Sequence, residues 1–459
     1  MVDWRKEIKE TLVLGIPMAG AQLSQLLMTT TDVALVGRLR GEALAAMAVG
    51  QASYGMVLSL GIGLCSAIGP LVSQAHGAEN RSAMVRSVAI GSAVALLLGL
   101  LCWPLLYQVD LLYRWLDYSP EMARLATGYT RAAALGLPFA FLFLVLKGYL
   151  DSVSRPRWPM AVAIIGILVN AAADYAFMYG YWGFPALGVT GTGLATSAVN
   201  LFMSAALLGM VWRGEHFKAM AQAKLAEWRE FLAVGFPIAG SIGVEVGLFV
   251  IGALMMGKLG TDEAAAHQIV LTCAATTFMV PLGVSFAGST RVGQAVGRRD
   301  FEAVRPAGLA SMGVGFAFMV FTCLLFVSFP HKIVELFWDP AVEKSQAVQM
   351  FAVQLLFIAG VFQMTDGVQV TAIGALRGLK DVTIPMLIAG LSYWVVGLSA
   401  AVYLTFYTPL RHQGLWIGFV LGLSTAAVGL TARFLILSQR VCHDKELQRR
   451  VSVEAAAEA

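Results

Sequence analysis

The chain has 459 residues, of which 58% are hydrophobic and only 13% charged, with a mean hydropathy of +0.73. This composition excludes an ordinary soluble protein and is typical of an all-α integral membrane protein with many spans. The net charge of +4 is small, and most basic residues lie in loops or at span ends, so we expect no nucleic-acid binding.

Twelve apolar segments follow one another along the chain, and each is long enough for a membrane helix. The hydrocarbon core of a bilayer is about 30 Å thick and takes about 20 helical residues. The segments fall near residues 11–37, 46–73, 84–108, 126–151, 158–181, 187–212, 230–258, 266–291, 304–329, 347–376, 382–407 and 413–438. The first ten residues are polar and lead into a full-length span, so we do not expect a cleaved signal peptide.

The chain contains an internal repeat. Residues 15–20 read GIPMAG and residues 235–240 read GFPIAG, and the same shift of 220 pairs Gly63 with Gly283. Further along, the shift becomes 226 and pairs Pro159 with Pro385. We therefore expect two pseudo-symmetric six-helix bundles, and an even number of spans in each makes the repeats parallel. The predicted parts are an N-terminal lobe (1–212), a cytoplasmic linker (213–229), a C-terminal lobe (230–440) and a cytoplasmic tail (441–459).

The orientation follows from the distribution of positive charge. Lys and Arg residues are concentrated in the N-terminal segment, in the linker and in the loops on the same side. By the positive-inside rule, both termini of this multi-pass protein are predicted to be cytoplasmic.

The first lobe carries polar residues inside its spans. Asn170 and Asp174 are four residues apart and project from one helix face. The depths of Asp32 and Thr196 in their own spans overlap with those of this pair. Two carboxylates, an amide oxygen and a hydroxyl are hard oxygen ligands, which suit Na⁺ or a proton shared between two acids. Three simpler roles stay open: Asp32 pairs with Arg38, Asn170 and Asp174 hold two helices together, and Thr196 bonds to its own helix backbone.

The second lobe carries two different acids. Glu245 lies near the middle of its span, where a charged side chain costs about 2.5–3.5 kcal/mol. No Lys or Arg lies within two turns of it on its own helix, which leaves a proton, a bound cation or a residue of another helix as its partner. Asp366 lies in the tenth span. The repeat places Gln25 and Ala140 at the positions of these acids in the first lobe, so each lobe is predicted to have its own acidic site.

Several motifs in order and spacing resemble the multidrug and toxic compound extrusion family, in its NorM-like branch. They are GIPMAG, TTTDVALVGRL, NAAADYAFMYG with GVTGTGLAT, GFPIAGSIGVEVGLF, GQAVGRRD and DGVQVTAIGALRGLKDVTIP. The resemblance implies an antiporter of the bacterial cytoplasmic (inner) membrane that exports drugs, dyes and other organic cations in exchange for Na⁺ or H⁺ by alternating access. It also implies that Asp32, Glu245 and Asp366 are coupling acids, and that Asn170, Asp174 and Thr196 complete the first-lobe site. We expect a monomer without a cofactor.

The sequence argues against a flippase and against an enzyme. A flippase of lipid-linked or other amphiphilic substrates would line its cavity with Arg and Lys for pyrophosphate, whereas these spans carry acids. An intramembrane enzyme would need a motif such as HExxH, which is absent, and of the six His only His267 lies in a span. The chain is therefore predicted not to be an enzyme.

Overall fold

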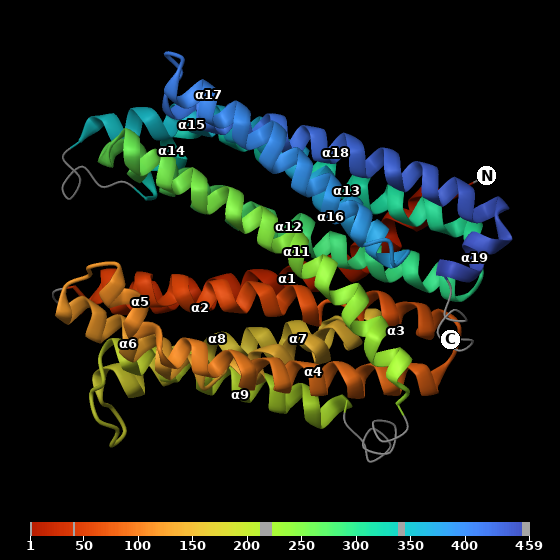
Figure 1. The fold of residues 1–459 in the computed structure, drawn as a ribbon, viewed down its shortest axis with the longest axis horizontal. Coiled ribbons are helices and arrows are strands. Elements are labelled where there is room, and N and C mark those ends of the chain that lie inside the picture. The colour runs from red at the N-terminus through yellow and green to blue at the C-terminus, as the bar shows by residue number, and fades with distance from the viewer. Residues whose placement is uncertain (1, 40–41, 212–222, 338–344, 452–459) are drawn as a thin grey trace. The chain divides into compact units, whose positions relative to one another are not determined.

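The computed structural model describes residues 2–39, 42–211, 223–337 and 345–451, and within these ranges all regular elements are helices (Figure 1). The first repeat contains α1 (Trp4–Val36), α2 (Ala43–Cys65), α3 (Ile68–Gly77), α4 (Arg81–Tyr107), α5 (Val109–Trp115), α6 (Pro120–Ala134), α7 (Leu137–Ser152), α8 (Arg157–Tyr179) and α9 (Val189–Val211). The second contains α11 (Leu225–Leu259), α12 (Thr261–Gly297), α13 (Phe301–Ser328), α14 (Pro330–Glu335), α15 (Gln346–Gly378), α16 (Thr383–Gly390), η1 (Leu391–Leu398), α17 (Ser399–Phe406), α18 (His412–His443) and α19 (Lys445–Val451).

The described helices include 11 that are long and apolar enough to span a membrane, or 12 when the bent pair α6 and α7 counts as one span. The predicted all-α membrane fold is confirmed. One predicted span differs, because residues 126–151 do not form a straight helix: α6 and α7 meet at 46°. Gly136 lies at this break and Pro138 lies in the first turn of α7, where proline cannot continue the preceding helix.

The repeat reappears in the helix boundaries. The α6–α7 pair, residues 120–152, corresponds at a shift of 226 to α15, residues 346–378. In α15 the residue at the position of Pro138 is Met364, and that helix is continuous. Similarly, α4 begins at Arg81 and α13 begins at Phe301, which is the shift of 220. Two copies of one helical unit therefore differ locally where their sequences differ.

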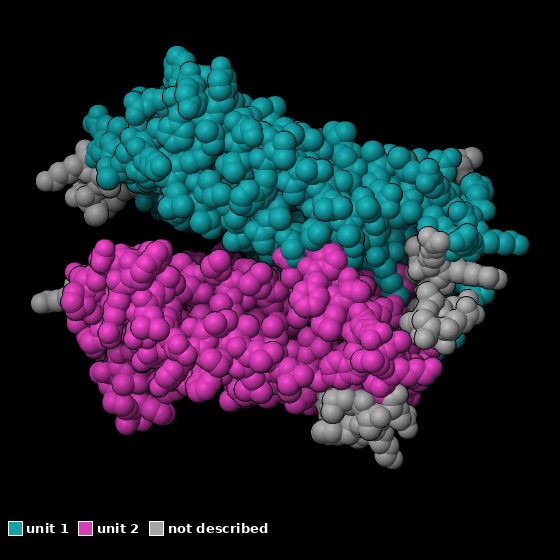
Figure 2. Space-filling view, viewed as in Figure 1, with its two compact units in different colours: residues 1–19, 77–79, 240–458 teal, residues 20–76, 80–239, 459 magenta. Residues whose placement is uncertain are grey.

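The chain forms two compact units, which Figure 2 shows in different colours. Unit 1 comprises residues 1–19, 77–79 and 240–458, and unit 2 comprises residues 20–76, 80–239 and 459. The chain passes between the units inside α1, after Ala19, and inside α11, after Ala239. The first half of α1 therefore belongs to the unit that holds most of the second repeat, and the first half of α11 belongs to the unit that holds most of the first repeat. The predicted lobes had each helix wholly in its own repeat. Residues 213–222 of the predicted linker and 452–459 of the predicted tail lie outside the described residues.

Small residues explain how these helix halves are held. In unit 1, a Cβ atom added to Gly283 of α12 would clash with the backbone of Ala19 in α1. In unit 2, a Cβ atom added to Gly63 of α2 would clash with the backbone of Ala239 in α11. Glycine allows the backbones of membrane helices to approach closely. Both contacts occur at equivalent positions of the repeat, so the exchange of helix halves is itself repeated.

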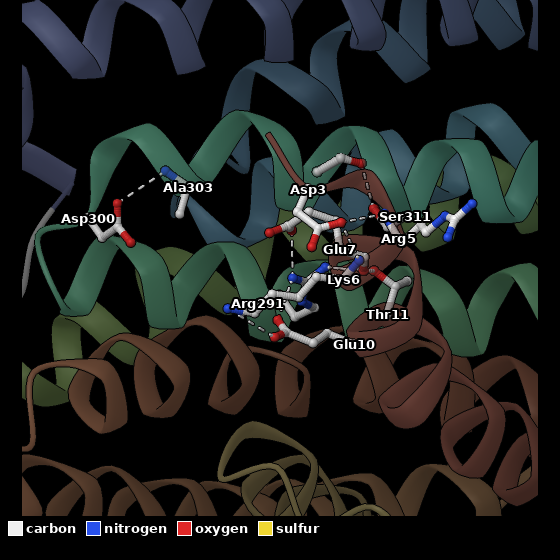
Figure 3. A network of polar contacts seen from close by, with 11 residues as sticks. Asp3, Arg5, Lys6, Glu7, Glu10, Thr11, Arg291, Asp300, Ala303 and Ser311 are labelled. Carbon is white, nitrogen blue, oxygen red and sulfur yellow. Dashed lines mark hydrogen bonds and ion pairs between the residues drawn. The ribbon is translucent and has the colours of Figure 1, made fainter. Parts of the chain in front are cut away.

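Ion pairs fix the same helix halves near their N-terminal ends. In unit 1, Arg291 of α12 donates to Glu7 Oε2 at 2.6 Å, to Glu10 Oε2 at 2.8 Å and to Thr11 Oγ1 at 2.7 Å (Figure 3). The main apolar core of unit 1 is built mainly by α12, α13, α15 and α18.

Candidate cation sites

Three of the predicted first-lobe residues meet in unit 2. Asn170 Nδ2 donates to Asp32 Oδ1 at 3.0 Å and to Asp174 Oδ2 at 3.1 Å. The three residues are 1%, 6% and 0% exposed, respectively. The two carboxyl groups also lie within hydrogen-bonding reach of each other. Asp32 therefore faces Asn170 and Asp174 in this arrangement, and the predicted convergence of these three side chains is observed.

The local structure of α8 explains this geometry. Asn170 and Asp174 lie one turn apart on the same helix face, as their spacing predicts. Tyr179, near the end of α8, donates its hydroxyl to the carbonyl of Leu35 at 2.9 Å and so ties α8 to the end of α1. The helix then ends at Gly180, whose φ of +77° is in the left-handed region that glycine favours.

A cavity of about 210 Å³ is lined by Asp32 and Asn170 of this group. Thr196 lines it, but its hydroxyl donates to Thr192 O of its own helix at 3.1 Å and also interacts with Tyr129. Thr196 therefore lies near the acids. Its hydrogen bond to Thr192 O is the simpler role that the sequence left open, a bond to the backbone of its own helix. The polar lining residues are Gln25, Thr29, Asp32, Gln51, Tyr54, Tyr129, Asn170, Thr196 and Asn200. Of the described lining residues, none is Lys, Arg or His.

The donor set in unit 2 fits a small hard cation or a proton. Asn170 Oδ1 and Asp174 Oδ1 are buried and have no hydrogen-bond partner, so each has an oxygen lone pair available. Oxygen ligands of this kind are preferred by hard cations, whereas transition metals favour imidazole and thiolate. In the described part of the chain, no three His, Cys, Asp or Glu side chains gather into a metal-binding group.

The two second-lobe acids lie in unit 1. Asp366 of α15 is 5% exposed and accepts a hydrogen bond from Gln369 Nε2 at 3.3 Å. Glu245 of α11 is half-buried, and its charge acts on Asp366. The acids of the two repeats thus belong to separate units, one pair in each.

Arg377 was not predicted as part of the second-lobe site. It lies near the end of α15, and its positive charge attracts Glu245. The sequence contains a signal for it, because Arg377 is 11 residues after Asp366, three helical turns further along the same face. Arg377 acts on Glu245 only through its charge, so the three alternatives predicted for the partner of Glu245 stay open.

Tyr393 was also missed. It lies in the π-helical segment η1, is 1% exposed, and its hydroxyl has no hydrogen-bond partner. The charges of both Glu245 and Asp366 act on this hydroxyl. Segments of π-helix often occur at functional sites, but the sequence run itself reads as an ordinary apolar span.

Comparison with known proteins gives consistent matches. The MatE family model matches residues 17–176 and 237–403. A protein named "Probable multidrug resistance protein NorM" from Rhizobium meliloti is 36% identical over 445 residues, covering 96% of this chain and 95% of the relative. A protein of the same name from Bradyrhizobium diazoefficiens is 38% identical over 443 residues, covering 95% of this chain and 94% of the relative.

Solved structures match the fold over almost the whole chain. The outward-facing structure of a multidrug resistance MATE family transporter of the MOP superfamily has a TM-score of 0.88 at 20% identity, covering 95% of this chain and 97% of that one. The eukaryotic MATE transporter AtDTX14 has a TM-score of 0.85 at 19% identity, covering 98% of both chains. These matches confirm the resemblance predicted from the motifs and the predicted all-α membrane fold.

Proposed function

The chain belongs to the MatE family of transporters, and from this premise we propose that it exports organic cations, including drugs and dyes, in exchange for Na⁺ or H⁺. Family membership also confirms that it is not an enzyme. The observation that carries the proposal is the buried group formed by Asp32, Asn170 and Asp174 beside a cavity whose described lining has no basic residue.

The proposed exchange rests on electrostatics. An ionised carboxylate inside a membrane is costly unless a positive partner neutralises it. The acids of unit 2 therefore hold a proton, a metal cation or a cationic substrate, and binding of one disfavours binding of another. Asn170 donates a hydrogen bond to each of the two carboxyl groups. The two groups are therefore held close together, and we propose that they bind one positive charge between them.

Glu245 and Asp366 are proposed to form the coupling site of unit 1. When one of the two carboxyl groups is ionised, ionisation of the other becomes less favourable. The pair therefore favours a bound cation or proton, as the acids of unit 2 do. Arg377 supplies part of the compensation to Glu245 and tunes how strongly that site attracts a cation.

Alternating access is proposed to involve bending of α1 and α11. Pro17 and Pro237 lie inside these helices, each three residues before the point where the helix enters the other unit. A proline inside a helix removes one backbone hydrogen bond and favours a kink. Movement of the units relative to each other would be absorbed at these two equivalent positions.

We further propose that the protein acts as a monomer in the bacterial cytoplasmic membrane, with both termini in the cytoplasm. The distribution of basic residues supports this orientation. Cysteine labelling of residues at the two ends of α18 in intact cells tests it, because only the loop before His412 should react with an impermeant reagent.

Dye efflux from proteoliposomes tests the transport function. Ethidium-loaded vesicles are exposed separately to a Na⁺ gradient and to a pH gradient, and at least one gradient should drive efflux. Efflux that depends on neither gradient contradicts the antiport mechanism. Glu245→Ala and Asp366→Ala should each abolish efflux at normal protein levels, whereas Glu302→Ala, an exposed acid of α13, should not. Wild-type rates in both of the first two variants would exclude those acids from coupling.

The flippase of amphiphilic substrates remains the alternative function. The cavity in unit 2 argues against it, because none of its described lining residues could neutralise a pyrophosphate. Translocation of a fluorescent lipid pyrophosphate by the same vesicles, without dye efflux, would favour the flippase.

A further inference from the structure

The loop that joins α8 to α9, at one end of unit 2, is strongly aromatic (Figure 1). Residues 181–187 read YWGFPAL, and every one of them is exposed. No charged residue occurs in the sequence between Asp174 and Arg213, so the loop has no charge of its own to interact with water. Exposed apolar patches of this kind mark interaction surfaces.

The loop is held in one arrangement by the last turns of α8. The amide of Leu187 donates to Phe177 O at 3.0 Å. The amide of Gly188 donates to Met178 O at 3.1 Å. The ring of Phe184 packs edge-on against that of Phe177, with the two centroids 4.9 Å apart. The exposed rings are therefore presented by an ordered backbone.

Trp182 has an uncommon backbone conformation within this loop. Its φ of +56° lies in the left-handed region, which costs conformational free energy for a residue with a side chain. Trp182 is 73% exposed, and with the described residues its side chain makes no hydrogen bond and no ring contact. The folding of unit 2 therefore gains little from this side chain, and its ring is available to a partner outside the chain.

The loop continues an exposed apolar face of α8. Ile164, Leu168 and Tyr175 follow one another at spacings of four and seven residues, so they lie on one helix face, and all three are exposed. In a membrane-spanning helix, an exposed apolar face is the one that contacts lipid. The ring of Tyr175 stacks on that of Tyr181 with centroids 4.5 Å apart, which joins the loop to this face.

The length of α8 indicates the depth of the loop in the membrane. The helix has 23 residues and is therefore about 34 Å long at 1.5 Å per residue, whereas the hydrocarbon core is about 30 Å thick. The end of α8 thus lies close to the boundary between hydrocarbon and head groups. Trp and Tyr side chains favour this boundary, because their rings are apolar and carry one polar group.

The corresponding loop of the second repeat is polar instead. At a shift of 226, Arg411 stands at the position of Pro185 and is paired with Glu263 at 3.1 Å. The next residue, His412, hydrogen-bonds through Nε2 to Gln354 Oε1 at 3.0 Å. These side chains attach the loop to unit 1 itself. The uncharged aromatic loop is thus specific to unit 2 and does not follow from the repeated architecture.

We propose that residues 181–187 anchor this end of unit 2 in the lipid–water interface of the bilayer. The rings of Trp182 and Phe184 lie among the upper acyl chains, and the indole N–H of Trp182 donates to a glycerol or phosphate oxygen of a phospholipid. Apolar area that the fold leaves exposed is thereby removed from water. The anchor does not depend on which ion or drug the protein transports.

Photo-cross-linking of the full-length protein in vesicles of dioleoylphosphatidylcholine tests the proposal. The photoreactive residue p-benzoylphenylalanine replaces Trp182 in one variant and Phe184 in a second, so each position keeps an aromatic ring. Lipid adducts are quantified by mass spectrometry after irradiation, and we expect them in both variants. The second position keeps the test decisive if the first variant does not fold.

Glu79→p-benzoylphenylalanine is the matched control. Glu79 is exposed and has a φ of +54°, close to that of Trp182, but it lies in the charged loop between α3 and α4. We expect about tenfold more lipid adduct at position 182 than at position 79, because burial of a large apolar side chain is favoured over water by at least that factor.

Two results would overturn the proposal. The first is an equal yield of lipid adduct at positions 79, 182 and 184 in folded protein, because the loop would then have no preferred contact with lipid. The second is cross-linking of positions 182 and 184 to another copy of the chain in place of lipid, because the loop would then be a contact between copies.

Discussion

Arg291 of α12 binds Glu7 of α1 through a 2.6 Å ion pair inside unit 1, although the two residues are 284 positions apart in the sequence. The equivalent acid of the second repeat, Glu227 of α11, binds Arg86 of α4 at 2.6 Å inside unit 2. Each repeat therefore uses the same glutamate, near the start of its first helix, to attach that helix half to its unit. The arginine partners come from different helices. The glutamate therefore occupies equivalent positions in the two repeats, whereas the arginine does not.

Arg291→Gln should destabilise unit 1. Arg291 is 8% exposed, and its loss removes charged hydrogen bonds to Glu7 and Glu10 and one to Thr11. Hydrogen bonds to charged groups contribute about 1.5–3 kcal/mol each, but partial exposure of the acids reduces their share, so we expect a total loss of about 2–3 kcal/mol. Thermal unfolding in detergent should show a clear fall in melting temperature.

A double-mutant cycle separates the ion pair from general disruption. Glu7→Gln and Arg291→Gln combined should destabilise less than the sum of the single changes. Arg298→Gln, at an exposed position shortly after Arg291 on the chain, is the control and should leave the melting temperature unchanged. Strict additivity in the cycle would mean that the 2.6 Å contact contributes nothing to stability.

Gly63→Ala should prevent the close packing of α2 against α11. The added methyl group would clash with the backbone of Ala239, which cannot rotate away as a flexible side chain could. Overpacking of a tight interior costs about 3 kcal/mol, so we expect reduced yield and a lower melting temperature. Gly69→Ala is the control within the same candidate span, since a Cβ atom there meets nothing within 4 Å. Equal melting temperatures for both variants would contradict the packing assignment.

The sequence predicted the parts of this architecture that depend on local pattern. The apolar segments and the shifts of 220 and 226 lead directly to the two repeats, and helical spacing placed Asn170 and Asp174 on one face. The depth of Asp32 in its own span identified it as their companion. Each of these inferences uses residues within one helix or within one copy of the repeat.

The features that were missed depend on contacts between distant segments. The exchange of the first halves of α1 and α11 rests on single glycines such as Gly63 and Gly283, and glycine is common throughout the chain. Arg377 follows directly after the predicted apolar segment 347–376, so the pattern did not place it at the site, although its charge acts on an acid of another helix. The bend at Gly136 was missed because the apolar composition continues across it.

Asn170→Leu should impair transport more than it impairs folding. The substitution removes the donor that serves both Asp32 and Asp174 and leaves two adjacent carboxyl groups without a bridge. It also removes Asn170 Oδ1, a buried oxygen without a hydrogen-bond partner, and loss of a ligand worth about 1.5 kcal/mol corresponds to roughly a tenfold weaker apparent affinity for the coupling ion. Ion-dependent dye efflux measured over a range of Na⁺ concentration and pH gives this affinity.

Tyr175→Phe is the control for Asn170→Leu, because Tyr175 neighbours Asp174 on α8 but is 44% exposed and stacks on Tyr181. Its efflux should equal that of the wild type. An unchanged ion dependence in Asn170→Leu, with normal protein levels, would mean that the asparagine has only a structural role between the helices.

Tyr393→Phe should weaken ion binding in unit 1 while leaving the fold intact. Phenylalanine keeps the ring that fills the interior and removes only a buried hydroxyl that has no hydrogen-bond partner and lies in the field of Glu245 and Asp366. A hydroxyl oxygen that ligates a bound cation contributes about 1 kcal/mol, so its loss should raise the half-saturating ion concentration about fivefold without changing the rate at saturating ion. Tyr403→Phe, 62% exposed in the neighbouring α17, should change neither quantity. If the ion dependence of Tyr393→Phe also matches the wild type, the hydroxyl does not contact the ion, and the acids of unit 1 bind it without help from η1.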